Sequence, residues 1–140
     1  MTMLKLIKYL RPFARYLLIA WLAIIIILSS IPNIPTLKIH TARSDFRLDY
    51  IMHFGEYGVL AFMAFLAFAE DKFRLNWKKF ITVAIGLVMF AILDELHQKL
   101  IPGRTCSIRD VASDVTGVLA AVGFTLVVFR SVRFGMGKRE

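Results

Sequence analysis

Four long apolar stretches limit the fold of this chain more than any other feature. They cover residues 13–31, 51–69, 80–98 and 111–129. A run of about 20 apolar residues is long enough to cross the hydrocarbon core of a bilayer as a helix. The runs are continuous and lack the alternation of lipid-facing barrel strands. The sequence therefore predicts an all-α integral membrane protein, a four-transmembrane-helix bundle that forms a single domain over residues 1–140.

The composition agrees with a membrane protein and excludes a soluble domain. Of the 140 residues, 58% are hydrophobic and only 20% are charged. The single cysteine, Cys106, cannot form a disulfide within the chain, and no Cys/His spacing predicts a structural zinc module. A net charge of +8 would suit nucleic acid in a soluble protein, but here the cations flank the apolar runs. The predicted partner is the lipid bilayer, with no nucleic acid.

The distribution of Lys and Arg predicts the orientation of the bundle. One face holds most of the eighteen cations: Lys5, Lys8, Arg11, Arg15, Lys72, Arg74, Lys78, Lys79, Arg130, Arg133, Lys138 and Arg139. The other face holds Lys38, Arg43, Arg47, Lys99, Arg104 and Arg109. Because Lys and Arg are retained on the cytoplasmic side, both termini are expected in the cytoplasm. The alternative for the first span is a signal peptide, which the poor cleavage sequence from Ser29 to Pro32 disfavours.

Polar residues gather at the ends of three spans, where ionisable groups are costly and therefore candidates for function. The second span opens with His53, Glu56 and Tyr57 on one helical face. The third span closes with Asp94, Glu95, His97 and Gln98, and the fourth opens with Ser107, Asp110 and Asp114. In a four-span topology all three groups lie at the extracytoplasmic side. We therefore expect one polar site there.

Small residues predict close helix packing beneath this site. Ser113, Gly117 and Ala121 recur at every fourth position of the last span. Small side chains allow helix backbones to approach closely in a membrane. The last span is therefore expected to pack centrally and to carry Asp110 and Asp114 into the bundle.

These motifs resemble the VanZ-like family of small bacterial membrane proteins. The resemblance covers residues 39–129 and is most specific between residues 94 and 117. It rests on Asp49, His53, Phe54, Tyr57, Asp94, Glu95, His97, Gln98, Pro102, Gly103, Arg104, Ser107, Asp110, Asp114 and Gly117. The departures are Cys106, at a position that is often aromatic in the family, and Asp114, where Asn is common. The resemblance implies a bacterial cytoplasmic (inner) membrane location and a link to teicoplanin resistance, without a defined activity.

Several roles are open for the polar residues. Glu95 and Arg104 are expected to form a charge-assisted clamp, and the alternative is a structural ion pair. His53 with Glu56, facing Asp94 and His97, has the donor types of a divalent metal site. His53 or Glu95 also has the chemistry for acid/base catalysis, with Arg104 holding an anion.

Structural roles compete with these chemical ones. Ser107 and Asp110 have the spacing of a capping box, so they are equally expected to start a helix. Asp49 reads in the same way as a helix N-cap. Tyr57 is more typical of packing or of a membrane interface than of ligand contact.

The sequence thus predicts a VanZ-like envelope protein that influences glycopeptide susceptibility. Its candidate catalytic residues are His53, Glu56, Asp94, Glu95, Arg104 and Asp110, and its candidate binding residues are Tyr57, His97, Gln98, Ser107 and Asp114. The expected ligand is a cell-wall precursor or a glycopeptide-related molecule, and a second copy of the chain is a further candidate partner, in a homo-oligomer. The alternatives are a membrane enzyme acting on a phosphorylated lipid or cell-wall precursor, and a non-catalytic partner subunit.

Overall fold

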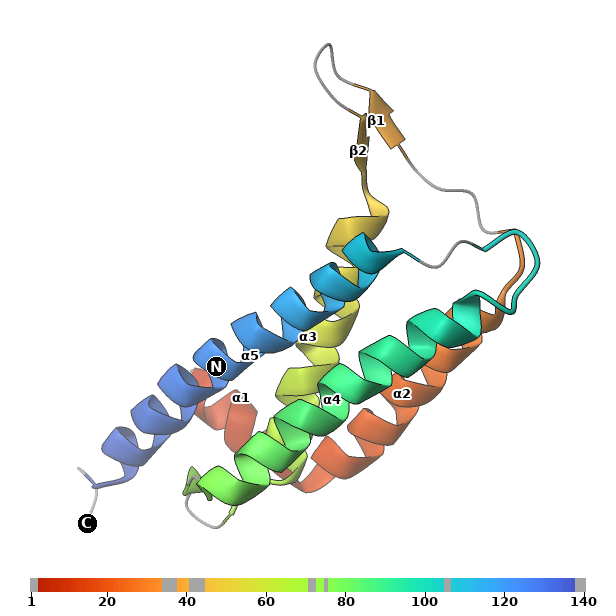
Figure 1. The fold of residues 1–140 in the computed structure, drawn as a ribbon. Helices are drawn as coiled ribbons and strands as arrows, with labels where there is room; N and C mark the ends of the chain where they lie inside the picture. The colour runs from red at the N-terminus through yellow and green to blue at the C-terminus, as the bar shows by residue number, and fades with distance from the viewer. Residues whose placement is uncertain are drawn as a thin grey trace.

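The protein is a bundle of four long helices. The computed structural model describes residues 3–33, 38–40, 45–70, 73–74, 76–104 and 107–137. The four helices are α2 (Ala14–Ser30), α3 (Asp49–Ala67), α4 (Trp77–Gln98) and α5 (Ile108–Gly137), shown in Figure 1. Each lies in a helical segment that is long and apolar enough to cross a membrane. The predicted all-α bundle is confirmed.

Short elements complete the chain. A helix α1 (Met3–Leu10) and a 3-10 turn η1 (Arg11–Phe13) precede α2. The strands β1 (Lys38–His40) and β2 (Asp45–Arg47) form an antiparallel hairpin between α2 and α3. Figure 1 shows this hairpin at the end of the bundle where α3 and α5 begin.

The last helix is longer than the apolar run that predicts it. The expected span ends at residue 129, but α5 continues to Gly137. Charged side chains end a hydrophobic run without ending a helix, and no proline interrupts this segment. Val128, Phe129 and Val132 are buried in a cluster that also contains Ile7 of α1. The extension of α5 therefore provides a surface on which the N-terminal helix packs.

Close packing of α3 on α5 places the start of both helices together, as the small residues predict. A Cβ atom added at Gly117 would lie 2.3 Å from the backbone oxygen of Phe54 and 3.0 Å from the backbone nitrogen of Gly58. Only glycine fits this crossing. α5 consequently lies directly along α3. The residues of α5 that come one turn before Gly117 in the sequence therefore face the start of α3.

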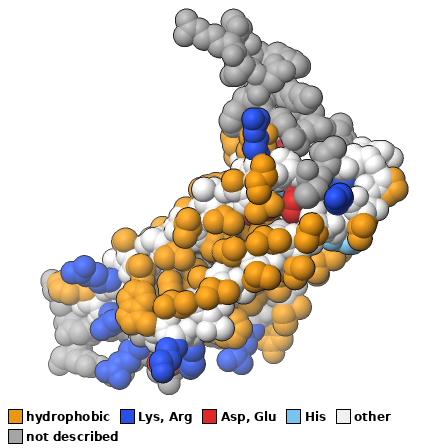
Figure 2. All heavy atoms as spheres, viewed as in Figure 1, with side chains coloured by type: hydrophobic (Ala, Val, Ile, Leu, Met, Phe, Trp, Pro, Cys, Tyr) orange, Lys and Arg blue, Asp and Glu red, His pale blue; other side chains and the backbone are white. Residues whose placement is uncertain are grey.

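The surface separates into an apolar belt and two polar ends. Figure 2 shows hydrophobic side chains covering the middle of the bundle, with Lys and Arg gathered at the end that holds the C-terminus. Ile27, Ile85, Leu93, Leu119 and Val127 are exposed members of this belt. Contact of such an apolar surface with lipid is favourable, whereas its contact with water is unfavourable.

Candidate functional site

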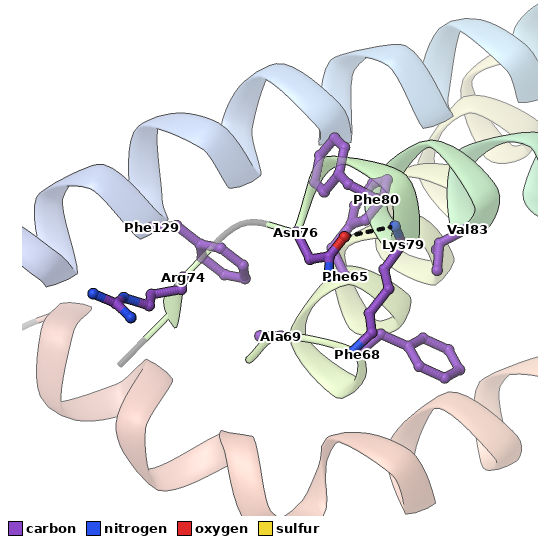
Figure 3. Close-up of a pocket in the computed structure, with 9 residues that line it drawn as sticks. All are labelled: Phe65, Phe68, Ala69, Arg74, Asn76, Lys79, Phe80, Val83 and Phe129. Carbon is purple, nitrogen blue, oxygen red and sulfur yellow. Dashed lines mark hydrogen bonds between the residues drawn. The ribbon is translucent and has the colours of Figure 1, made fainter. Parts of the chain in front are cut away.

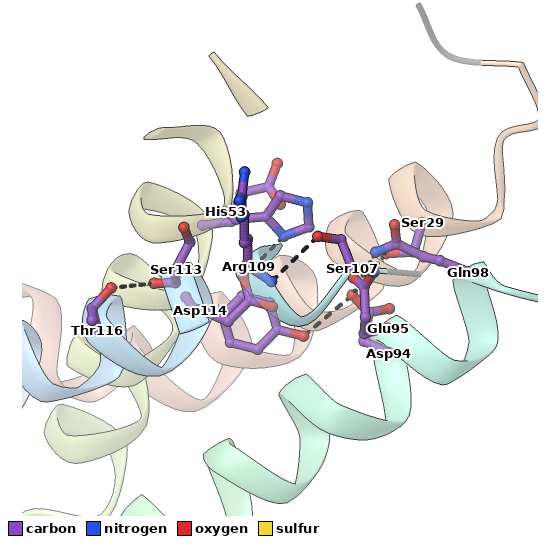
Figure 4. Close-up of polar contacts among 12 residues, drawn as sticks. Ser29, His53, Asp94, Glu95, Gln98, Ser107, Arg109, Ser113, Asp114 and Thr116 are labelled. Atoms are coloured by element: carbon purple, nitrogen blue, oxygen red, sulfur yellow. Dashed lines mark hydrogen bonds and ion pairs between the residues drawn. The ribbon is translucent and has the colours of Figure 1, made fainter. Parts of the chain in front are cut away.

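The polar residues predicted from the sequence meet at one end of the bundle. The end of α2, the start of α3, the end of α4 and the start of α5 all contribute side chains. Figure 4 shows His53 of α3, Glu95 of α4 and Asp114 of α5 within one layer. We call this layer the polar site; its members are Ser29, His53, Tyr57, Asp94, Glu95, Gln98, Ser107, Asp110 and Asp114.

Asp94 is the centre of a hydrogen-bond network that joins three helices. Its Oδ2 accepts hydrogen bonds from Ser29 Oγ at 2.9 Å, Tyr57 OH at 3.2 Å and Gln98 Nε2 at 3.3 Å. Gln98 Nε2 also donates to Ser29 Oγ at 3.4 Å. Since all four side chains are buried, each donor offsets part of the cost of keeping a carboxyl group away from water.

His53 and Asp114 form a second polar pair. His53 Nδ1 lies 2.9 Å from Asp114 Oδ1, and their side chains are 13% and 1% exposed. The pair exists because the glycine crossing of α3 and α5 brings these two helices together. A carboxylate held against one ring nitrogen fixes the orientation of an imidazole and leaves the other nitrogen for a proton, a metal or a ligand.

Glu95 joins the start of α5 to α4. Its Oε1 accepts a hydrogen bond from the backbone N–H of Ser107 at 2.6 Å. Ser107 in turn caps α5, because its Oγ accepts from the backbone N–H of Arg109 at 3.2 Å. The predicted helix-start role of Ser107 is thus confirmed. Glu95, from a different helix, takes the Ser107 N–H that Asp110 would take in a capping box.

Arg104 has a different partner from the one expected. Its Nη2 donates to the carbonyl oxygen of Leu28 at 2.6 Å and its Nε donates to that of Ile31 at 3.3 Å. The predicted Glu95–Arg104 clamp is replaced because each group satisfies backbone groups at a helix end. A guanidinium at the C-terminus of α2 also interacts favourably with the helix dipole. Arg104 therefore caps the C-terminus of α2, and its predicted role toward an anion stays a prediction.

The remaining predicted residues lie at the edge of the polar site or deep within it. His97 Nε2 lies 3.0 Å from Ser30 Oγ. Glu56 is half-buried, and its backbone oxygen accepts from Trp21 Nε1 at 3.0 Å. Asp110 is buried and lies close enough to Glu95 for an electrostatic interaction. Asp49 is the first residue of α3, whose N-cap is Leu48, so it adds charge to the first turn without capping it.

The residues able to hold a metal differ from the predicted set. Ligand atoms of His53, Glu95 and Asp114 all lie within 4.8 Å of one another. Asp94 is occupied by its three donors, and His97 faces α2. Since consecutive residues of a helix are about 100° apart, Asp94 and Glu95 cannot both face the same neighbour. Glu95 faces α5 and takes the place expected for Asp94.

Sequence reasoning missed the side chains that α2 contributes at and near the polar site, among them Ser29 and Trp21. Ser29 hydrogen-bonds Asp94, and the Trp21 side chain hydrogen-bonds the backbone of α3. The available signal was the position of Ser29 at the outer end of the first apolar run. Serine is nearly neutral on hydropathy scales, so it did not stand out as the carboxylates did.

The opposite end of the bundle has a small cavity and an exposed ion pair. Figure 3 shows the cavity, about 20 Å³ and lined by Phe65, Phe80 and Phe129 among others, which has room for about one water molecule. Nearby, Lys79 Nζ donates to Glu70 Oε1 at 2.9 Å and Asn76 Nδ2 donates at 3.1 Å. These two bonds lower the pKa of the exposed Glu70 carboxyl, and the bond from Lys79 has the larger effect. This pair is a useful control for the polar site.

One family of known proteins matches the chain. The family model described as VanZ/LLP1 matches residues 9–130, which is most of the chain. No curated protein and no solved structure gives a match.

Proposed function

The chain belongs to the VanZ/LLP1 family, and from that premise we propose that it is a bacterial cytoplasmic-membrane protein that lowers susceptibility to teicoplanin. It does so by binding or modifying a component of the cell envelope at the polar site. Its four apolar helices make it a multi-pass membrane protein.

One observation carries the proposal: nearly fully buried carboxylates lie together at one end of the bundle. Glu95 and Asp114 are each 1% exposed, and Asp110 is 3% exposed. Ionisable groups in membrane spans cost roughly 2.5–3.5 kcal/mol each on insertion scales. Packing alone would be served better by apolar residues. Such a cost favours a chemical role for this layer.

The charge distribution supports an outward-facing polar site. The end of the bundle opposite the polar site, where Figure 2 shows Lys and Arg side chains gathered, includes Arg11, Arg15, Arg74, Lys79 and Arg130. The positive-inside rule then assigns that end, with both termini, to the cytoplasm. The polar site consequently faces the cell wall, where glycopeptides act.

The His53–Asp114 pair favours a second candidate, an enzyme acting on a phosphorylated lipid or cell-wall precursor. A histidine oriented by a carboxylate is a common arrangement for proton transfer. In this candidate His53 acts on the substrate and Asp114 positions His53. Turnover of such a substrate by the purified protein would separate this candidate from a binding protein or a non-catalytic partner subunit.

The test is the inhibitory concentration of teicoplanin and vancomycin for a sensitive Gram-positive host that expresses the protein. We expect the wild type to raise the teicoplanin value and Glu95→Gln to return it to that of the empty vector. Glu70→Gln is the matched control, because it removes the same charge at the opposite end and should act like wild type. The amount of the protein in the membrane must be equal in all strains. A wild type without effect, or a Glu95→Gln variant that acts like wild type, would refute the proposal.

A further inference from the structure

We propose that His53, Glu95 and Asp114 bind a divalent transition-metal cation of the zinc class between α3, α4 and α5. The inference deepens the function proposed above, since it assigns a ligand to the same polar site. A metal-binding measurement tests it independently of that function.

The geometry of the three side chains is close to that of a metal site. One ligand atom from each lies within 4.8 Å of the other two, and each residue comes from a different helix. Around a tetrahedral ion with bonds of about 2.0–2.2 Å, ligand atoms lie roughly 3.5 Å apart. Small side-chain rotations therefore close the set around an ion. Figure 4 shows the three side chains turned toward the space between the helices.

A separate observation indicates that a cation is needed there. Glu95 Oε2 and Asp114 Oδ2 are buried and have no hydrogen-bond partner among the residues that the structure describes. Both side chains are 1% exposed, so solvent does not satisfy these oxygens. Buried polar atoms are almost always paired, and a buried carboxylate without a counter-charge costs several kcal/mol. A divalent cation would satisfy both oxygens at once.

The ligand chemistry selects the class of metal. One imidazole with two carboxylates suits zinc or manganese, whereas magnesium and calcium prefer oxygen ligands alone. Three protein ligands leave a fourth position open, as in catalytic zinc sites. A cation with an open position would also let an acidic layer accept the phosphate or carbonyl oxygen of an envelope component.

Calorimetric titration with Zn²⁺ tests the proposal on the chelator-treated full chain in lipid nanodiscs, with excess Mg²⁺ present. We expect saturable binding of one Zn²⁺ per chain. Loss of an outer-sphere partner alone weakens metal sites about 10–100-fold, so Glu95→Gln and Asp114→Asn should each weaken binding at least about tenfold. The matched control, Glu70→Gln at the other end of the bundle, should bind like wild type.

A second measurement guards against variants that fail to fold. Zn²⁺ should raise the unfolding temperature of the wild type, and His53→Gln should fold but lose that rise. Absence of saturable binding to the wild type, or wild-type binding by Glu95→Gln and Asp114→Asn, would overturn the metal site. Zinc binding without any change in teicoplanin susceptibility would instead leave the metal site standing and refute the proposed function.

Discussion

At the scale of single residues, the neighbouring carboxyl groups of Asp94 and Glu95 have different roles in the polar site. Asp94 has three side-chain donors from α2, α3 and α4 and functions as a structural tie. Glu95 uses one oxygen for the Ser107 N–H and keeps the other unpaired among the described residues. Neighbouring carboxylates can thus differ in role because the helix turns them toward different partners.

The structural role of Asp94 predicts a stability loss when one of its donors is removed. Tyr57 is fully buried and its hydroxyl donates to Asp94. Tyr57→Phe should lower the free energy of unfolding by about 1–3 kcal/mol, because the buried Asp94 carboxyl group loses one of its hydrogen-bond donors. Tyr16→Phe, at a side chain that is 74% exposed, should leave stability unchanged. The free energy of unfolding of both variants is measured by denaturation in detergent. Equal losses for the two substitutions would contradict the structural role of Asp94.

At the scale of elements, the crossing of α3 and α5 sets the geometry of the site. The His53–Asp114 pair lies near this crossing, where the two backbones are in contact through Gly58 and Gly117. A separation of the helices by even the radius of a methyl group would pull the pair apart. The glycines therefore belong to the construction of the site, although they carry no chemistry.

This contact predicts that Gly117→Ala damages the bundle and that another glycine of α5 tolerates the same change. The new Cβ at residue 117 would lie 2.3 Å from the Phe54 oxygen, whereas a Cβ at Gly123 meets nothing within 4 Å. Gly117→Ala should cost about 1–3 kcal/mol through overpacking. Gly123→Ala should be neutral or stabilising by a few tenths of a kcal/mol. Thermal unfolding of both variants makes the comparison, and similar losses would show that the crossing is not tight.

At the scale of the whole molecule, the apolar runs predict the helical architecture well, but the sequence predicts the pairing of polar groups much less. Spans, packing of small residues and convergence of the polar layer follow from hydropathy and helix periodicity. The partners of Glu95 and Arg104 depend on loop geometry, which periodicity does not define. At Gly103, φ is +77°, and a Cβ there would collide with Asn33. That turn directs Arg104 to the end of α2.

The outward direction of the polar site is the central claim, and thiol labelling of intact cells tests it most directly. In a Cys106→Ser background, Leu100→Cys places one exposed thiol at the polar-site end, and Arg74→Cys places one at the cation-rich end. A membrane-impermeant maleimide should label Leu100→Cys in intact cells and Arg74→Cys only after permeabilisation. Labelling of Arg74→Cys in intact cells, with Leu100→Cys protected, would place the polar site in the cytoplasm and contradict the account.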